Sequence, residues 1–256
     1  MTDTNDLQGT VALVTGASSG IGDATALALA ARGAAVSLVA RRVERLEALV
    51  GRINDGGGKA LSIPADVSKH NEATGAVEQT VSELGRLDTL VNNAGVMLLG
   101  PALDAPIEEW QRMINVNLYG PLYCTHAGLP HLLRAADDSP RRVADLVNIS
   151  SVAGRVARAG SGVYNLTKHG VGAFSESLRQ EVTTRHVRVS LVEPGAVETE
   201  LATHNRPEIR EQIGQRFGSI ERLQAGDIAD AIIYIVTRPR HVAINELLVR
   251  PTEQTG

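Results

Sequence analysis

The residues best suited to chemistry in this chain are Tyr164 and Lys168. Their spacing of one helical turn places both side chains on the same face of a predicted helix, where they can meet around a ligand. A free tyrosine has a pKa of roughly 10, too high for an efficient base near neutral pH, but a neighbouring ammonium favours the phenolate. Ser151 lies upstream of the pair at the end of a predicted strand, and its hydroxyl can face the same centre. The Tyr-x-x-x-Lys pair alone occurs by chance on many helices, so a proton-transfer site is predicted only together with the motifs around it.

A glycine-rich turn near the N-terminus supplies part of that context. Residues 11–14 form an apolar run without alternation, as expected of a parallel strand buried on both faces, and residues 23–32 read as a helix. Between them lie Gly16, Gly20 and Gly22. Glycine lets the backbone turn tightly and approach a ligand, and the N–H groups at a helix start favour an anion. The predicted ligand is a dinucleotide pyrophosphate, and the alternative is a glycine turn without a ligand.

The next predicted strand covers residues 34–40, and two arginines follow it. These arginines indicate which dinucleotide binds. In dinucleotide-binding folds an acid at this strand end holds the ribose hydroxyls of the adenosine, whereas an arginine accommodates a 2′-phosphate. Ala40 stands where the acid would be, and Arg41 and Arg42 follow it. A guanidinium matches phosphate oxygens bidentately. We therefore expect NADP(H) rather than NAD(H), the alternative being that both arginines only cap a surface helix.

Polar residues also follow two further predicted strands. Asp66 comes directly after residues 60–65, where its carboxylate could accept a hydrogen bond from an adenine amino group or cap the helix that begins near Ser68. Residues 89–91 run into the sequence Asn-Asn-Ala-Gly at 92–95. We expect Asn92 to tie neighbouring strands together, and residues 93–95 to line the nucleotide.

The remaining segments alternate between helix and strand. Residues 107–127 carry a long helical pattern that contains Asn115 and Asn117, although asparagine is a poor helix former. Residues 129–135 are predicted as another helical segment and residues 137–142 as a surface loop. Later elements are strands at 145–151, 187–192 and 246–249, and helices at 163–184 and 227–237. The strand at 145–151 ends in Ser150 and Ser151, so Ser150 is the rival for the chemical role of Ser151.

Taken together, the TGxxxGxG turn, the NNAG sequence, Ser151 with the Tyr-x-x-x-Lys pair, and the later Pro194-Gly195 resemble the short-chain dehydrogenase/reductase family. The resemblance implies an α/β fold, a single doubly wound Rossmann-type domain with a mostly parallel seven-stranded sheet flanked by helices. It also implies an NADP(H)-dependent oxidoreductase that acts on a CH–OH group and transfers a hydride between the nicotinamide and a carbonyl or alcohol substrate. We expect one domain over residues 1–256, with a helical substrate lid at about 200–224.

The same resemblance assigns roles to individual residues. Tyr164 would be the general acid/base, Ser151 would polarise the substrate oxygen, and Lys168 would lower the tyrosine pKa and bind the nicotinamide ribose. Asn117 would hold a relay water at a local helix distortion, with Asn115 as the alternative if the register is misread. Thr199 would bind the carboxamide, unless it only caps a helix before Glu200. The residues expected to bind the cofactor are Gly16, Ser18, Ser19, Gly20, Ile21, Gly22, Arg41, Arg42, Asp66, Val67, Asn93, Ala94, Gly95, Tyr164, Lys168, Pro194, Gly195, Val197 and Thr199.

Segments such as ARRVERL, NNAGVMLLGP, ISSVAGRV and the terminal VRPTEQ are similar to a subgroup of this family, the one that contains clavulanate dehydrogenase and bacterial 3-hydroxy acid dehydrogenases. The similarity weakens in the 137–142 loop and in the predicted lid, where part of the substrate specificity resides. The substrate is therefore expected to be a carbonyl or alcohol compound, either an aldehyde similar to clavulanaldehyde or a 3-hydroxy acid. A catalytically silent NADP(H)-binding sensor is the remaining alternative, but a sensor has no need of Asn117, Ser151, Tyr164 and Lys168.

Composition limits the other classes of function. The chain has 256 residues and a formal net charge of −4, which gives no broad electrostatic footprint for nucleic acid. Its single cysteine, Cys124, cannot form an intramolecular disulfide and is expected in the core. No leader pattern or membrane-length apolar run is present, and the histidines have no metal-site spacing. We expect a cytoplasmic protein without a metal, with a small-molecule substrate as its partner, and the family resemblance implies a homo-oligomer, a tetramer or dimer.

Overall fold

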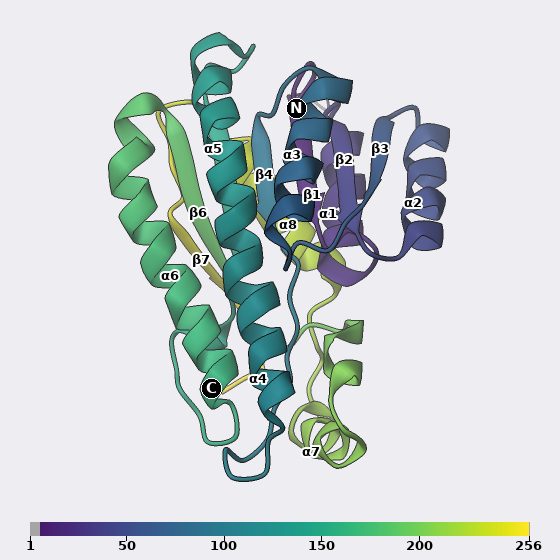
Figure 1. The fold of residues 1–256 in the computed structure, drawn as a ribbon, viewed down its shortest axis with the longest axis vertical. Helices are drawn as coiled ribbons and strands as arrows, with labels where there is room; N and C mark the ends of the chain where they lie inside the picture. The colour runs from purple at the N-terminus through teal and green to yellow at the C-terminus, as the bar shows by residue number, and fades with distance from the viewer. Residues whose placement is uncertain (1–5, 256) are drawn as a thin grey trace.

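Seven parallel strands form one sheet in the order β3-β2-β1-β4-β5-β6-β7 in the computed structural model (Figure 1). The structure describes residues 6–255, apart from the side chains of Arg216 and Phe217, so the two ends of the predicted domain lie outside the described residues. The strands are β1 Val11–Thr15, β2 Ala35–Ala40, β3 Lys59–Pro64, β4 Thr89–Asn92, β5 Ala144–Ile149, β6 Val187–Pro194 and β7 Glu246–Val249. The doubly wound parallel sheet predicted from the sequence is confirmed.

Helices connect the strands and cover both faces of the sheet. The helices are α1 Gly20–Ala31, α2 Val43–Asp55, α3 His70–Leu84, α4 Ile107–Ile114, α5 Gly120–Asp138, α6 Gly162–Val182, α7 Pro207–Phe217 and α8 Ala225–Val236. Short helical turns lie at η1 Asn115–Tyr119, η2 Val152–Gly154, η3 Thr183–Arg185 and η4 Glu200–His204.

The segment before β5 agrees with the prediction in one respect and differs from it in another. The helical pattern at residues 107–127 continues from α4 through the π-helical turn η1 into α5, and η1 is the local distortion expected near Asn117. The predicted separate helix at 129–135 lies inside α5, which continues to Asp138 through Pro130. The loop begins at Ser139 rather than at residue 137, because α5 includes Asp137 and Asp138.

The core consists of two apolar layers, one on each face of the sheet. On one face, Ala12 and Val14 of β1 pack in a cluster with residues of α1, α2 and α8. On the other face, Leu13 packs in a cluster with residues of α3, α5 and α6, and Cys124 is buried there as expected. Successive residues of β1 are thus buried on opposite faces, which explains why its sequence is apolar without alternation.

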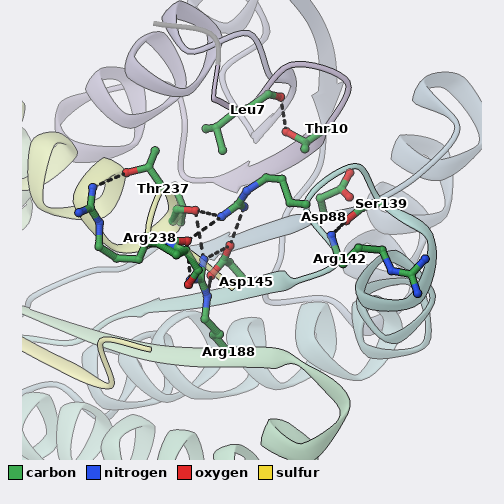
Figure 2. Close-up of polar contacts among 12 residues, drawn as sticks. Leu7, Thr10, Asp88, Ser139, Arg142, Asp145, Arg188, Thr237 and Arg238 are labelled. Carbon is green, nitrogen blue, oxygen red and sulfur yellow. Dashed lines mark hydrogen bonds and ion pairs between the residues drawn. The ribbon is translucent and has the colours of Figure 1, made fainter. Parts of the chain in front are cut away.

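A buried ion pair joins β5 and β6 near their amino ends. Arg188 donates to both carboxylate oxygens of Asp145, at 2.7 and 2.9 Å, and to the main-chain carbonyl of Arg238 (Figure 2). It also donates to the main-chain carbonyl of Val242. Arg141 donates to the same carboxylate at 3.1 Å. These contacts fasten the connection between α8 and β7 to the amino edge of the sheet.

The carboxyl ends of the strands lie at the opposite edge, where the strand order reverses between β1 and β4. In open parallel sheets, ligands bind in the crevice at such a reversal. The turns after β1, β4, β5 and β6 all open at this edge, and η4 and α7 follow β6 beyond it (Figure 1).

Candidate active site

A cavity of about 480 Å³ opens at the carboxyl edge of the sheet. Its walls come from the turns that follow β1 to β6, from the start of α6, and from η4 and α7. All the residues that the sequence predicts as cofactor-binding line this cavity except Gly20 and Gly22. Residues from segments far apart in the chain therefore meet at one place, as the motifs predict.

The glycines of the first turn serve two purposes. Gly16 has a φ of +67°, and a Cβ atom there would lie 2.8 Å from the Cα of Ala94, so only glycine lets this turn pass beside the turn after β4. A Cβ on Gly22 would lie 2.4 Å from the carbonyl oxygen of Gly16, so Gly22 lets α1 pack against the turn rather than facing the cavity. The cradle without a side chain at Gly16 fits the close approach of a dinucleotide pyrophosphate.

Asparagine side chains hold the two turns together. Asn93 donates through Nδ2 to the carbonyl of Thr15 at 2.9 Å, while the Thr15 hydroxyl accepts from the main-chain N–H groups of Asn93 and Ala94 at 3.0 Å. Asn92 donates to Asn148 of β5 and to Thr125 of α5. Asn92 therefore ties strands and helix together as predicted, and Asn93 adds a structural role to its place in the cavity wall.

Tyr164 and Lys168 lie in the first turns of α6 and are both buried, with 6% and 7% of their surface exposed. The Lys168 ammonium lies 5.8 Å from the centre of the Tyr164 ring and donates a 2.8 Å hydrogen bond to the carbonyl of Ile149. Both side chains line the cavity. The predicted helix thus brings the two groups to one face, directly beside the end of β5.

The electrostatics of this pair differ from the simple expectation. Burial raises the pKa of Tyr164 to about 12, opposed by a hydrogen bond with Ser151, and burial lowers the pKa of Lys168 to about 8. Burial is the dominant influence on both groups, and the lowering of the tyrosine pKa by Lys168 together with the positive charge of an oxidised nicotinamide stays a prediction. At neutral pH the phenol is protonated and can donate a proton.

The two serines after β5 point to different partners. The Ser150 hydroxyl is buried and donates to the main-chain carbonyl of Lys168 at 3.1 Å, so it braces α6 against β5. The Ser151 oxygen accepts from the N–H of Ala153 at 3.1 Å and hydrogen-bonds the Tyr164 side chain. Of the two, Ser151 is the hydroxyl placed beside the phenol.

Asn117 lies in the π-helical turn between α4 and α5, the local distortion that the family resemblance implies. Its carboxamide accepts from the N–H of Val96 and donates to the carbonyl of Val96, both at 2.8 Å, and it donates to Thr167 at 3.2 Å. Asn117 is buried behind the cavity wall, whereas Asn115 is exposed. The register was therefore interpreted correctly, and the side chain holds the segment after β4 against α6.

At the far end of the cavity, Arg42 spans the glycine turn. Its guanidinium donates to the Ser18 hydroxyl at 2.9 and 3.0 Å and to the Ser19 hydroxyl at 2.7 Å. A further N–H of Arg42 pairs with Glu200 at 2.8 Å, and Arg45 pairs with the second oxygen of Glu200 at 2.6 Å. Sequence reasoning missed Arg45 and Glu200. Arg45 could have been found from its place one helical turn after Arg41 and Arg42, whereas nothing in the sequence connects Glu200 to them.

Asp66 lines the cavity near this end and also closes a turn. Its Oδ1 accepts from the N–H and the hydroxyl of Ser68, at 3.0 and 2.7 Å, while α3 begins only at His70. Burial would raise the pKa of Asp66, but the bonds from Ser68 and the Arg41 and Lys69 charges hold it below its usual value. Asp66 is thus an ionised acceptor at neutral pH, and it closes the turn before α3 without capping that helix, whose N-cap is Lys69.

The segment after β6 forms the last wall. Thr199 is the N-cap of η4, its hydroxyl accepting from the N–H of Leu201 at 3.3 Å, and it also lines the cavity. A Cβ on Gly195 would lie 2.4 Å from the side-chain oxygen of Gln254, which accepts from the N–H of Ala196. No pattern in the sequence indicates this hydrogen bond between Gln254 and Ala196.

Residues 6–255 lack two further kinds of feature. Within this range no three or more His, Cys, Asp and Glu side chains gather as metal ligands would. No helix within it has the length and apolar character needed to span a bilayer.

Comparisons with known proteins agree with this geometry. The family model described as short chain dehydrogenase matches residues 10–210. An uncharacterized oxidoreductase of Staphylococcus saprophyticus is 36% identical over 98% of this chain and 99% of its own length. The closed form of a serine dehydrogenase complexed with NADP+ is 31% identical, with a TM-score of 0.86 over 96% of this chain and 97% of that one. A 3-ketoacyl-(acyl-carrier-protein) reductase from Brucella melitensis complexed with NADH is also 31% identical, with a TM-score of 0.82 over 95% and 98% of the two chains.

Proposed function

Because this chain belongs to the short-chain dehydrogenase family, we propose that it is an NADP(H)-dependent oxidoreductase that interconverts a carbonyl compound and the corresponding alcohol. The observation that carries the proposal is the buried group of Tyr164, Lys168 and Ser151 in the wall of the cavity. Buried ionisable groups with displaced pKa values are costly to keep, and they occur preferentially where chemistry is done. A silent dinucleotide-binding protein would gain nothing from them.

The cofactor choice depends on the adenosine end of the cavity. Complexes of similar proteins include both NADP+ and NADH, so the family alone leaves the choice open. Arg41 and Arg42 line the cavity after β2, where an acid would favour NAD(H). Two positively charged guanidinium groups at this place support NADP(H).

Each residue of the group contributes a separate step. When bound, the nicotinamide supplies or accepts the hydride at the substrate carbon. In reduction, the Tyr164 phenol donates its proton to the substrate oxygen as negative charge develops there, and in oxidation it takes that proton back. Ser151 donates a hydrogen bond to the same oxygen and orients it. The Lys168 ammonium lies beside the phenolate that remains on Tyr164 after proton donation. Its positive charge stabilises that phenolate.

Asn117 and Thr199 act by position. Asn117 keeps Val96 in place beside the cavity through two hydrogen bonds, and its proposed role is to hold the relay water that the family resemblance implies. Thr199 and Val197 line the cavity, and their proposed role is to orient the carboxamide of the nicotinamide. The segment from η4 through α7 acts as the lid over the substrate.

The substrate class is tested by following NADPH absorbance with a panel of aldehydes, ketones and 3-hydroxy acids. An aldehyde similar to clavulanaldehyde and a 3-hydroxy acid are the two leading members of the panel, because of the subgroup resemblance. The same preparation, examined by light scattering, tests the proposed homo-oligomer, a tetramer or dimer. Failure of every member to be turned over while NADPH still binds would favour a sensor.

The role of the phenol is tested with Tyr164→Phe. Loss of the proton donor should lower kcat by about 10³-fold while NADPH binding is retained. Tyr234→Phe is the matched control, since Tyr234 is half exposed on α8 and contacts Arg238 rather than the cavity. Substantial hydride transfer by Tyr164→Phe would contradict the mechanism.

A further inference from the structure

Glu200 presents a carboxylate between two arginines at the place expected to receive the 2′-phosphate. One oxygen lies 2.8 Å from Arg42 and the other lies 2.6 Å from Arg45, so each oxygen has its own guanidinium. These two hydrogen bonds hold the pKa of Glu200 at about 2, and the carboxylate is ionised at any working pH. Glu200 also lines the cavity. An anion supplied by the protein therefore already occupies this cationic corner.

Most N–H donors of Arg42 already have hydrogen-bond partners in this arrangement. Its Nε and Nη2 groups donate to the hydroxyls of Ser18 and Ser19, which leaves the Nη1 edge for an anion, and that edge is held by Glu200. A phosphate monoester brings close to two negative charges to the same place. Two anions that close together repel, so a 2′-phosphate must displace the carboxylate or bind beside it at a cost.

A cofactor without the phosphate meets the opposite situation. The ribose 2′-hydroxyl is a hydrogen-bond donor, and in dinucleotide folds that use NAD(H) an acidic residue accepts from it. Such an acid normally comes from the end of the second strand, where this chain has Ala40. Here a carboxylate reaches the same corner from the segment after β6, far away in the sequence.

We propose that Glu200 is a specificity-determining residue that competes with the 2′-phosphate for Arg42 and Arg45 and so moderates the preference for NADP(H) over NAD(H). The proposal rests on the NADP(H) assignment above. Arg45 becomes a third arginine of the phosphate site, freed when Glu200 is displaced. Because Glu200 opens η4, exchange of the carboxylate for the phosphate also releases one anchor of the lid segment.

The test compares Glu200→Gln with Glu198→Gln. Both variants remove one negative charge from the same segment, but Glu198 is exposed, pairs with Gln224 and does not line the cavity. Dissociation constants for NADPH and NADH are measured by nicotinamide fluorescence, without a substrate. For Glu200→Gln we expect NADPH to bind about three- to ten-fold more tightly and NADH to bind no more tightly than to the unchanged protein. For Glu198→Gln both constants should stay within two-fold of the starting values, about the limit set by weak long-range charge effects.

The outcomes separate this proposal from the one on which it rests. An equal change for both cofactors, or weaker NADPH binding by Glu200→Gln, would overturn the competition. Tighter binding of NADH than of NADPH by the unchanged protein would instead contradict the NADP(H) assignment, while the shift in ratio caused by Glu200→Gln would still measure competition. Thermal melts establish that each variant is folded, and Glu200→Ala repeats the test without a side-chain amide.

Discussion

Arg188 and Lys168 are both buried cations near β5, but they lie at opposite edges of the sheet and differ in their partners. At the amino edge, Arg188 pairs with Asp145, and its remaining N–H groups donate to main-chain carbonyls (Figure 2). At the carboxyl edge, Lys168 donates to the carbonyl of Ile149, and no carboxylate within residues 6–255 pairs with it. A charge with its partners complete supports the fold, whereas a charge left without a counterion beside a cavity is available to a ligand or a reaction.

This difference in partners predicts that substituting the two cations changes the free energy of unfolding differently. Removing one member of a complete buried ion pair leaves the other member uncompensated, which is strongly destabilising. A buried ammonium without a counterion already destabilises the fold, as the lowered pKa of Lys168 shows. The two cations can therefore be told apart by making the same substitution at each.

The largest effect is expected from Lys168→Met. Loss of the ammonium should lower kcat/KM by about 10³-fold, because the phenolate left after proton donation is no longer stabilised. Stability at pH 7 should not fall, since an apolar side chain of similar length replaces a poorly solvated charge. Steady-state kinetics and thermal melts on the same preparation measure both effects. A variant that loses stability but keeps its activity would reverse the comparison.

The pH dependence of stability sharpens the same point. The folded pKa of Lys168 is about 8, below the unfolded value of 10.5, so between these values the unfolded chain binds more protons. The lysine therefore opposes folding fully below pH 8, and this effect is lost as the pH rises toward 10.5. The stability advantage of Lys168→Met should shrink over that range in denaturant titrations. An advantage that is constant from pH 7 to 10 would show that the ammonium is not the cause.

The second effect is expected from Arg188→Met. Leaving Asp145 with a buried charge paired only through Arg141 should lower the free energy of unfolding by about 3–5 kcal/mol. The folded fraction should keep its kcat/KM, because the network lies at the edge away from the cavity. Arg179→Met is the control, since Arg179 pairs with Glu176 on the surface of α6, where such a pair contributes about 0–1 kcal/mol.

This contrast also marks how far the sequence could be interpreted. The glycines of the first turn have fixed spacing within one local element, and so do Tyr164 and Lys168 within another, so each motif could be predicted from the sequence, and the family resemblance predicted that the two motifs meet. Asp145 and Arg188 pair across strands, and Glu200 meets Arg42 only through the fold, so no local pattern announces either contact. Burial was also missed as the dominant influence on Tyr164, because a sequence shows neighbours along a helix but not the loss of solvent around them.

The third prediction concerns Asn205. Its hydrogen bonds are complete, as those of Arg188 are, but it lies near the cavity, as Lys168 does. It is buried at the cavity edge, yet its carboxamide is fully used, accepting from the N–H of Leu99 at 2.7 Å and donating to the carbonyl of Met97 at 2.9 Å. Asn205→Ala leaves these backbone groups without partners, so we expect a loss of about 1–3 kcal/mol in stability. Because Met97 and Leu99 line the cavity, KM for the substrate should rise more than kcat falls. Asn205→Asp keeps the bond from Leu99 but turns an acceptor oxygen toward the carbonyls of Met97 and Ala202, so it should be no more stable than Asn205→Ala. An unchanged KM would make Asn205 purely structural.

The smallest effect is expected from Arg41→Ala, measured against Arg42→Ala. Arg41 is exposed, whereas Arg42 is partly buried and fixed by the two serine hydroxyls, so less ordering is needed before Arg42 can hold a phosphate. We expect NADPH binding to weaken by about three- to ten-fold in Arg41→Ala and by more than tenfold in Arg42→Ala, with little change for NADH in Arg41→Ala. Added salt should reduce the effect of Arg41 more, since an exposed charge is better screened. Equal losses for NADPH and NADH in both variants would mean that neither arginine recognises the 2′-phosphate, and that cations at the cavity edge can be as purely structural as Arg188.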